Sequence, residues 1–197
     1  MPVRQKESDP STARKPRADG ARNREQLLEA AKHAFADQGS AASLEGIART
    51  AGVSIASLYR HFPTRDLLIE AAYRQETDLL VQQATRLMAE SEPLTALREW
   101  LTLFVDFLDA KHNMAEALET LIGGPELLYS GTPARLAAPV TTLVERAAAA
   151  GAIGTNVEPL DLLRAIAGVA NAKHSGYSRK AAIQMVELLL KGLQADR

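Results

Sequence analysis

Apolar residues recur at helical spacing along most of the chain and predict about nine α-helices and no strand. In the first of these, Leu27, Leu28 and Ala31 share one face, and Gly39 follows as a stop. The predicted helices span about 22–38, 44–51, 54–62, 65–90, 94–110, 114–122, 133–150, 159–173 and 178–193. Residues 1–20 carry several prolines and no hydrophobic periodicity, which predicts a disordered arm.

Local signals mark the ends of the second, third and fourth helices. Ser43, Ser54 and Thr64 each precede an apolar run, and a side-chain oxygen at such a position can cap the first turn of a helix. Gly52 lies between the second and third helices and suits a sharp turn, and Pro63 forbids continuation of the third. Three helices therefore fit into about forty residues.

The fifth and the last two predicted helices are apolar on more than one side. The fifth, around Trp100, is expected to be buried nearly all round. Each of the last two carries apolar residues on two faces, and a single chain cannot easily bury both of these faces. We expect them to form a four-helix bundle with a second copy, and a core within one chain is the alternative. The predicted dimer residues are Leu163, Ile166, Ala167, Ala170, Met185, Val186, Leu189 and Leu193.

Composition supports an all-α protein with a basic N-terminal part. The chain has 35 Ala against 9 Val and 7 Ile, and Ala loses least on entering a helix. Up to Arg74 it carries 12 Lys and Arg against 9 Asp and Glu, and after it 11 against 15. A basic first part on an acidic remainder suggests that the first part faces a polyanion.

The absence of cysteine and of long apolar runs limits the cellular compartments in which we expect the protein. Without Cys the 197-residue chain forms no disulfide and no thiolate metal site, as is typical of a reducing cytoplasm. No run approaches the roughly 20 apolar residues of a membrane-spanning helix, and the first 25 residues are charged where a signal peptide would be apolar. We therefore expect a cytoplasmic protein without a membrane partner.

The second and third predicted helices and the turn between them form a helix-turn-helix, whose second helix enters the DNA major groove. Apolar residues are expected to lock the two helices together: Ile47, Ala48, Val53, Leu58 and Phe62. The residues left on the outside are Ser54, Ile55, Ala56, Ser57, Tyr59, Arg60 and His61.

Residues 22–70 strongly resemble the DNA-binding head of TetR-family transcriptional regulators. Three blocks carry the resemblance, in order and at the family's spacing: Ile47-Ala48, Ala51-Gly52-Val53-Ser54 and Leu58-Tyr59-Arg60-His61-Phe62-Pro63. Ala56 stands where the family commonly has Gly, Ser57 where Thr is common, and Gly46 where a polar residue is usual. These departures leave the fold intact and concern the residues that would contact bases and phosphates.

The resemblance implies a homodimer that binds a palindromic operator. Tyr59 and His61 would touch phosphates, Arg65 would match the family's basic residue at the start of the fourth helix, and residues 54–57 would meet base edges. The predicted DNA-binding residues are Arg22, Arg24, Ser43, Arg49, Ser54, Ile55, Ala56, Ser57, Tyr59, Arg60, His61 and Arg65. We expect a disordered basic arm at 1–20, a helix-turn-helix DNA-binding domain at 21–65, here called the head, and a helical ligand-binding and dimerisation domain at 66–197, here called the body.

Family members usually hold a small-molecule inducer among the helices of the body, and the resemblance implies a repressor that such a molecule releases. An apolar pocket with few polar groups is expected there. Its predicted residues are Met88, Trp100, Phe104, Phe107, Met114, Leu118, Leu121, Ile122, Tyr129, Asn171 and His174. Apolar residues at helical spacing are also typical of plain core, and the sequence does not identify an inducer.

No catalytic constellation is visible in the sequence. The four His residues show no metal-ligand spacing, and there is no Gly-x-Ser-x-Gly elbow or phosphate-binding glycine loop. We therefore expect no enzyme activity, no cofactor and no metal. A helical scaffold or ligand-binding protein that has lost operator binding is the alternative to a regulator.

Overall fold

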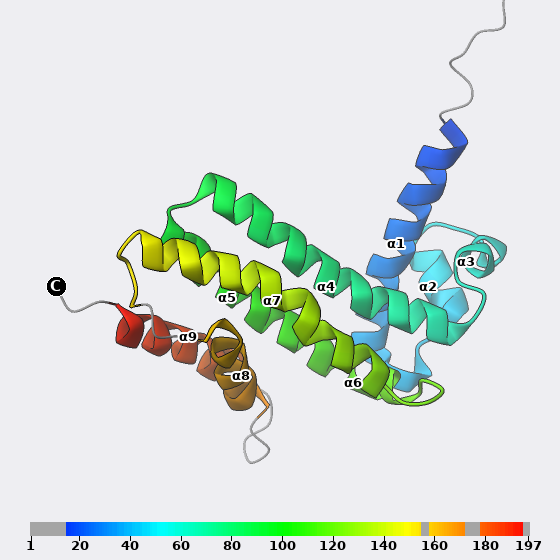
Figure 1. The fold of residues 1–197 in the computed structure, drawn as a ribbon. Coiled ribbons are helices and arrows are strands. Elements are labelled where there is room, and N and C mark those ends of the chain that lie inside the picture. Colours follow the sequence, from blue (N-terminus) through cyan, green and yellow to red (C-terminus); the bar gives the residue numbers. More distant parts are fainter. Residues whose placement is uncertain (1–14, 155–157, 172–177, 195–197) are drawn as a thin grey trace, which may run out of the picture.

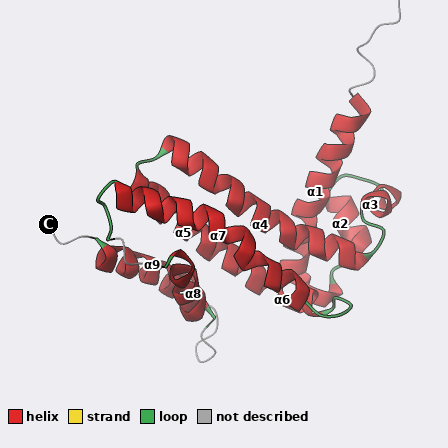
Figure 2. Cartoon of the chain, in the orientation of Figure 1, coloured by secondary structure: helices red, strands yellow, loops and turns green. Residues whose placement is uncertain are grey.

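The computed structural model describes residues 15–154, 158–171 and 178–194, and this part of the chain is built from helices without a strand (Figures 1 and 2). In chain order the helices are α1 (Lys15–Gln38), the 3-10 turn η2 (Gly39–Ala41), α2 (Leu44–Thr50), α3 (Ile55–His61), α4 (Arg65–Glu90), α5 (Pro93–Asn113), α6 (Ala115–Glu119), α7 (Glu126–Ala149), α8 (Pro159–Ala170) and α9 (Arg179–Leu193). The predicted all-α fold is confirmed.

The head closes around one apolar cluster. Phe35 of α1, Ile47 of α2 and Leu58 of α3 are at most 1% exposed. The predicted caps are present: the hydroxyl oxygens of Ser43, Ser54 and Thr64 accept hydrogen bonds from the backbone N–H groups of Gly46, Ser57 and Leu67 at 3.1, 3.2 and 3.2 Å. Gly52 turns the chain between α2 and α3 with a φ of 70°, which a side chain would disfavour. Local chemistry thus sets the turn between α2 and α3 and the N-terminal ends of α2, α3 and α4.

The body packs around α5. This helix contacts α4, α7, α8 and α9, and Trp100 at its middle is fully buried, with its indole Nε1–H donating to the Leu80 carbonyl at 2.9 Å. The prediction of a central fifth helix is confirmed. Figure 1 shows α4 running from α1–α3 into the body. One continuous helix therefore connects the two regions.

Two helices begin earlier than their sequence pattern predicts. The first starts at Lys15 and not at Arg22, so residues 15–20, predicted as part of a disordered arm, are helical. Pro16 occupies the first turn, where a missing N–H leaves no helical hydrogen bond unmade. Residues 1–14 lie outside the described residues.

The seventh helix starts at Glu126 and not at Pro133, and it includes Pro133 and Pro139. Proline disfavours a helix interior by roughly 3 kcal/mol, but the first turns of α7 are held by contacts with α4. The hydroxyl groups of Tyr73 and Thr132 lie 2.9 Å apart, and the rings of Tyr73 and Tyr129 meet edge to face at 5.7 Å.

None of the helices in the described ranges is long and apolar enough to cross a bilayer.

Candidate functional site

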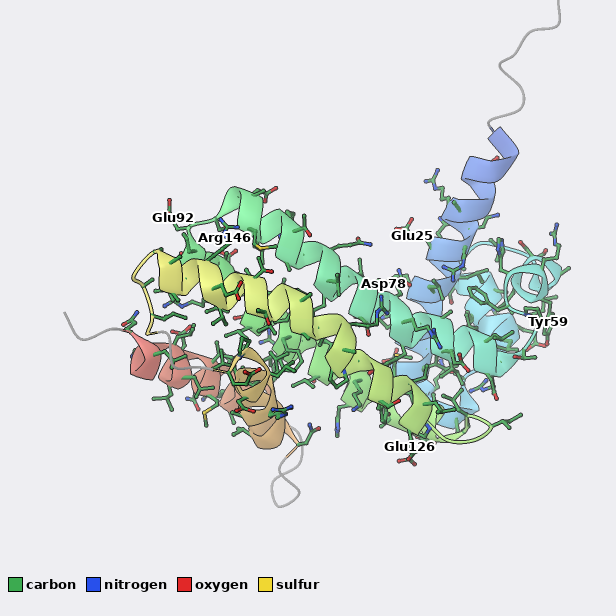
Figure 3. All side chains as sticks on the ribbon, in the orientation of Figure 1. Glu25, Tyr59, Asp78, Glu92, Glu126 and Arg146 are labelled. Atoms are coloured by element: carbon green, nitrogen blue, oxygen red, sulfur yellow. The ribbon has the colours of Figure 1, made fainter. Side chains whose placement is uncertain are left out.

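The outer face of α3 is open to solvent. Tyr59 is 46% exposed, and Ser54, Ala56 and Arg60 are exposed beside it. Figure 3 shows Tyr59 projecting from the outer side of the head, away from the body. The helix thus presents a phenol, a guanidinium and small side chains together, and these groups suit phosphates and base edges.

Three residues of the predicted outer face lie further inside. Ser57 is only 9% exposed, so the expected contact between its hydroxyl and a base edge is wrong for this conformation. Ser57 and the adjacent Leu58 are the two buried residues of α3. Ile55 is half-buried against the core, and His61 is half-buried beside Phe62, with the two ring centroids 6.3 Å apart.

The hydroxyl of Ser43 is occupied within the head. It accepts from the Gly46 N–H and donates to Glu45 Oε2, both at 3.1 Å. Ser43 thus caps α2 while its residue remains exposed, and its DNA contact stays a prediction. Ser54 also caps its helix, although it remains exposed on the outer face.

Arg65 points into the protein. Its guanidinium donates to the carbonyl oxygens of Ala42 at 2.5 Å and Ser40 at 2.9 Å, and it lies 5.2 Å from the ring centroid of Phe35. These carbonyls follow α1, where no helical N–H is left to satisfy them. In this structure Arg65 ties α4 to the turn η2, and its DNA contact stays a prediction.

The other predicted basic residues remain at the surface. Arg22 and Arg24 of α1, and Arg49 of α2, are exposed. The Arg24 guanidinium lies 5.3 Å from the ring centroid of Phe62, which holds it next to the C-terminal end of α3. Arg24 and Arg60 thus flank the open face with positive charge.

The body contains a cavity of about 240 Å³ among α4, α5, α7 and α8. Its lining residues are Tyr73, Phe104, Phe107, Leu108, Lys111, Tyr129, Thr132, Pro133, Leu136, Leu160, Leu163, Arg164 and Ala167. Aromatic rings form much of the wall, since Phe107 lies 5.9 Å from Tyr73 and 6.1 Å from Phe104 between ring centroids. Such an apolar hollow with a few polar groups is typical of small-molecule sites.

Comparison with known proteins agrees with these two features. The family model described as bacterial regulatory proteins, tetR family, matches residues 27–72, and the one described as the C-terminal domain of SbtR-like transcriptional regulators matches residues 92–195. The crystal structure of a TetR transcriptional regulator from Streptomyces coelicolor is 37% identical to this chain, with a TM-score of 0.75, covering 88% of this chain and 99% of that one. The chain belongs to the TetR family. It is a DNA-binding transcriptional regulator.

Two further solved structures show how widely the fold is shared. A TetR regulator from Mycobacterium vanbaalenii is 28% identical, with a TM-score of 0.75 over 91% of this chain and 99% of that one. The fatty acid degradation regulator FadR from Bacillus halodurans is 18% identical, with a TM-score of 0.60 over 86% and 98%, and shows the likeness of fold alone.

Three residues predicted for the pocket of this TetR regulator line the cavity: Phe104, Phe107 and Tyr129. Five others, Met88, Trp100, Met114, Leu118 and Leu121, are not among the lining residues. Four of these are core side chains no more than 7% exposed, and Met88 is partly buried against the core. Ile122 is 94% exposed, and Asn171 is exposed with its amide donating to the Ala167 carbonyl at 2.8 Å, so both predictions are wrong. His174 lies outside the described residues.

Four polar lining residues escaped the sequence prediction: Tyr73, Lys111, Thr132 and Arg164. Lys111 lies in the polar last turn of α5, between Asp109 and His112, so no local pattern distinguishes it from a solvent-exposed lysine. Burial lowers the pKa of its ammonium. Burial and the negative charges that surround it raise the pKa of Tyr129 to about 12. The described residues include no cluster of three His or acidic side chains that would hold a metal ion.

The predicted dimer residues of the TetR regulator divide into two groups. Ile166, Ala170 and Val186 are fully buried by their own chain and Leu163 is 6% exposed, so these four present no surface to a second copy. The rest, Ala167, Met185, Leu189 and Leu193, are half-exposed, and Ala167 lines the cavity. Leu188 is 63% exposed beside them on α9. The apolar surface that α8 and α9 leave open therefore includes only part of the predicted set, together with Leu188.

Proposed function

We propose that this regulator is a homodimeric repressor whose two heads bind a palindromic operator, and that a small molecule in the body cavity releases it. Residues 21–65 would form the DNA-binding domain and residues 66–197 the ligand-binding and dimerisation domain. The observation that carries the proposal is the solvent-exposed face of α3, with Tyr59 at its centre. The proposal includes no catalytic step and no cofactor.

DNA contacts follow from what each exposed group can reach. Tyr59, Arg60 and His61, with Arg22, Arg24 and Arg49, would bind phosphates and set the register of the head. Ser54, Ala56 and Ile55 lie at the N-terminal end of α3, which enters the major groove first in a helix-turn-helix. Ala56 and Ile55 suit a thymine methyl, and Ser54 suits a polar base edge.

The dimer would form on the exposed flank of α8 and α9. Ala165 and Gly168 on α8 are exposed and small, which permits close approach of a second helix. Met185, Leu188 and Leu189 on α9 supply apolar surface to bury. An isologous pairing of these two helices with their copies is a four-helix bundle, as predicted.

The conformational change that releases DNA would be transmitted from the cavity to the head through α4 and α6. Tyr73 of α4 lines the cavity, and α4 continues to the head. One hydrogen bond links the head to α6, because Ser40 Oγ donates to Glu116 Oε1 at 2.6 Å. A second links the loop after α6 to the first turn of α4, where the Ile122 N–H donates to Asp66 Oδ2 at 3.1 Å. A coupling of about 1 to 3 kcal/mol between the two sites would weaken operator binding roughly 5- to 150-fold.

Selection of bound sequences from random duplex DNA with the purified full-length protein tests the proposal. We expect an inverted repeat whose half-site centres lie about 34 to 36 Å apart or a multiple of it, and a dimer in light scattering. Tyr59→Ala is expected to abolish enrichment, whereas Leu79→Ala, a similarly exposed apolar residue in the body, leaves it unchanged. A monomer, or binding that salt abolishes without sequence preference, would refute the proposal in favour of the scaffold alternative.

A further inference from the structure

The ammonium group of Lys111 is an unusual member of the cavity wall. It stands on the last turn of α5, and its Nζ lies 3.7 Å from the ring centroid of Tyr129 on α7. The side chain is partly buried, and the ring is the partner that the structure gives it. A cation held against an aromatic face in a partly dry site retains much of its attraction for an anion.

No carboxylate neutralises this ammonium among the described residues. Lys111 takes part in none of their ion pairs. The charged lining residues are Lys111 and Arg164, and the lining includes no acidic side chain. Arg164 pairs at 2.5 Å with Asp161, and both are well exposed. The charged side chains that line the cavity are therefore cations, and Glu119 and Glu126, which act on Tyr129, are not among the lining residues.

The remaining walls favour a ligand that contains an aromatic ring. Rings of Tyr73, Phe104, Phe107 and Tyr129 follow one another with centroid separations of 5.7 to 6.1 Å. Offset and edge-to-face contacts among aromatic rings occur at these separations. The cavity of about 240 Å³ lies below the roughly 300 to 1,000 Å³ of sites for drug-sized ligands. The occupant is therefore compact.

We propose that the effector of this regulator is a compact aromatic carboxylate, whose ring lies against Phe104 and Phe107 and whose carboxylate pairs with Lys111. This inference rests on the proposed release by a ligand and adds its chemical class. A carboxylate at Lys111 would supply the counter-ion that the lining lacks. Tyr73 and Thr132 add hydroxyl groups to the same wall for a second polar contact.

A purely structural role for Lys111 would be to place a positive charge at the C-terminal end of α5, where a helix dipole favours cations. Lys191 occupies the equivalent position in the last turn of α9, is exposed and does not line the cavity. Lys191→Met is therefore the matched control for Lys111→Met, since both remove a cation from a helix terminus and only one changes the cavity.

Calorimetric titration of the full-length protein without DNA tests the inference. The probes are benzoate, phenylacetate and hydrocinnamate, each compared with its uncharged primary amide. We expect at least one acid to bind roughly 10- to 100-fold more tightly than its amide, as befits a charge-assisted hydrogen bond in a partly buried site. Lys111→Met is expected to remove this preference, and Lys191→Met to keep it.

Equal affinity for acid and amide, a preference that survives Lys111→Met, or no measurable binding of any acid would each overturn the inference. Thermal unfolding of both variants shows whether a loss reflects misfolding, and Lys111→Arg, which keeps the charge, is expected to retain the preference for acids. Release of the selected operator is measured separately. Acids that bind without releasing DNA would refute the proposed release mechanism and leave the ligand class standing.

Discussion

The head and the body recognise their partners with opposite parts of their structure. In the head, fully buried Phe35 and Leu58 help to hold α1, α2 and α3 together, and the recognition groups lie on the outside. In the body, long helices enclose aromatic rings around a hollow, and the recognition groups point inwards. A small tightly filled unit suits a rigid DNA duplex, whereas an incompletely filled core suits a molecule that enters it.

The two regions also differ in the contacts that their partly buried cations make. The Arg65 guanidinium in the head has hydrogen bonds to main-chain carbonyls and a ring contact, so its bonding capacity is largely used. The Lys111 ammonium in the body has a ring contact. A buried cation with its donors occupied is structural, and one with donors left over is a candidate binding group.

The largest expected difference comes from truncating one leucine in each region. Leu58→Ala, at a fully buried site in the head, is expected to lower the free energy of unfolding by about 4 to 5 kcal/mol. Leu108→Ala, at the cavity wall, is expected to cost about 2 to 3 kcal/mol, because one side of that leucine already lacks packed neighbours. Urea unfolding measures both, and equal losses would mean that the body core is as filled as the head core.

Arg65→Met is the next largest change. Loss of its hydrogen bonds to the carbonyls after α1 is expected to destabilise the protein by about 2 to 3 kcal/mol in urea unfolding. Below the unfolding transition, operator binding is expected to keep its dependence on salt. Arg60→Met is the control: it is expected to leave stability unchanged and to reduce the salt slope by about 1, as for a phosphate contact. A reduced slope for Arg65→Met would confirm its DNA contact.

Helix caps are expected to contribute equally to the free energy of unfolding in both regions. Thr64→Ala removes the acceptor for the Leu67 N–H at the start of α4, and Ser178→Ala removes the acceptor for the Ala181 N–H at the start of α9. Each is expected to cost about 1 kcal/mol in urea unfolding. A much larger loss at either position would show that the side chain has a further role.

The smallest expected effect is the pH dependence of the body. The pKa of Tyr129 is raised to about 12, above the usual value of about 10 for an unfolded chain. Its contribution to stability is therefore complete below about pH 10 and is lost as the pH rises towards 12. Tyr129→Phe is expected to flatten this alkaline decline in urea unfolding. An unchanged decline in the variant would assign it to other groups.

The sequence predicted the head more closely than the body, because the head is specified locally. Ser43, Ser54, Thr64 and Gly52 act on the residues next to them, and α2, α3 and α4 start where those signals predict. The internal hydrogen bonds of Arg65 were not predicted, because its carbonyl partners lie more than twenty residues away and no local pattern reveals them.

The body depends on contacts between distant helices, which a single sequence does not display. Pro133 was interpreted as the start of a helix, but packing of Tyr129 and Thr132 against Tyr73 extends α7 beyond it. Trp100 and Phe104 have the same character in sequence, yet one fills the core and the other lines the cavity. Periodicity identifies which side of a helix is apolar and does not reveal whether atoms fill the space that it faces.

The length of α4 converts small movements into large ones. Its 26 residues form a rod of about 39 Å, so pivoting it by about 5° at one end shifts the other by roughly 3 Å. A shift of that size is comparable to the rise of one base pair. Two heads carried on two such helices would then no longer match the spacing of the major grooves on a straight duplex. A small tilt would be enough, without any change of fold.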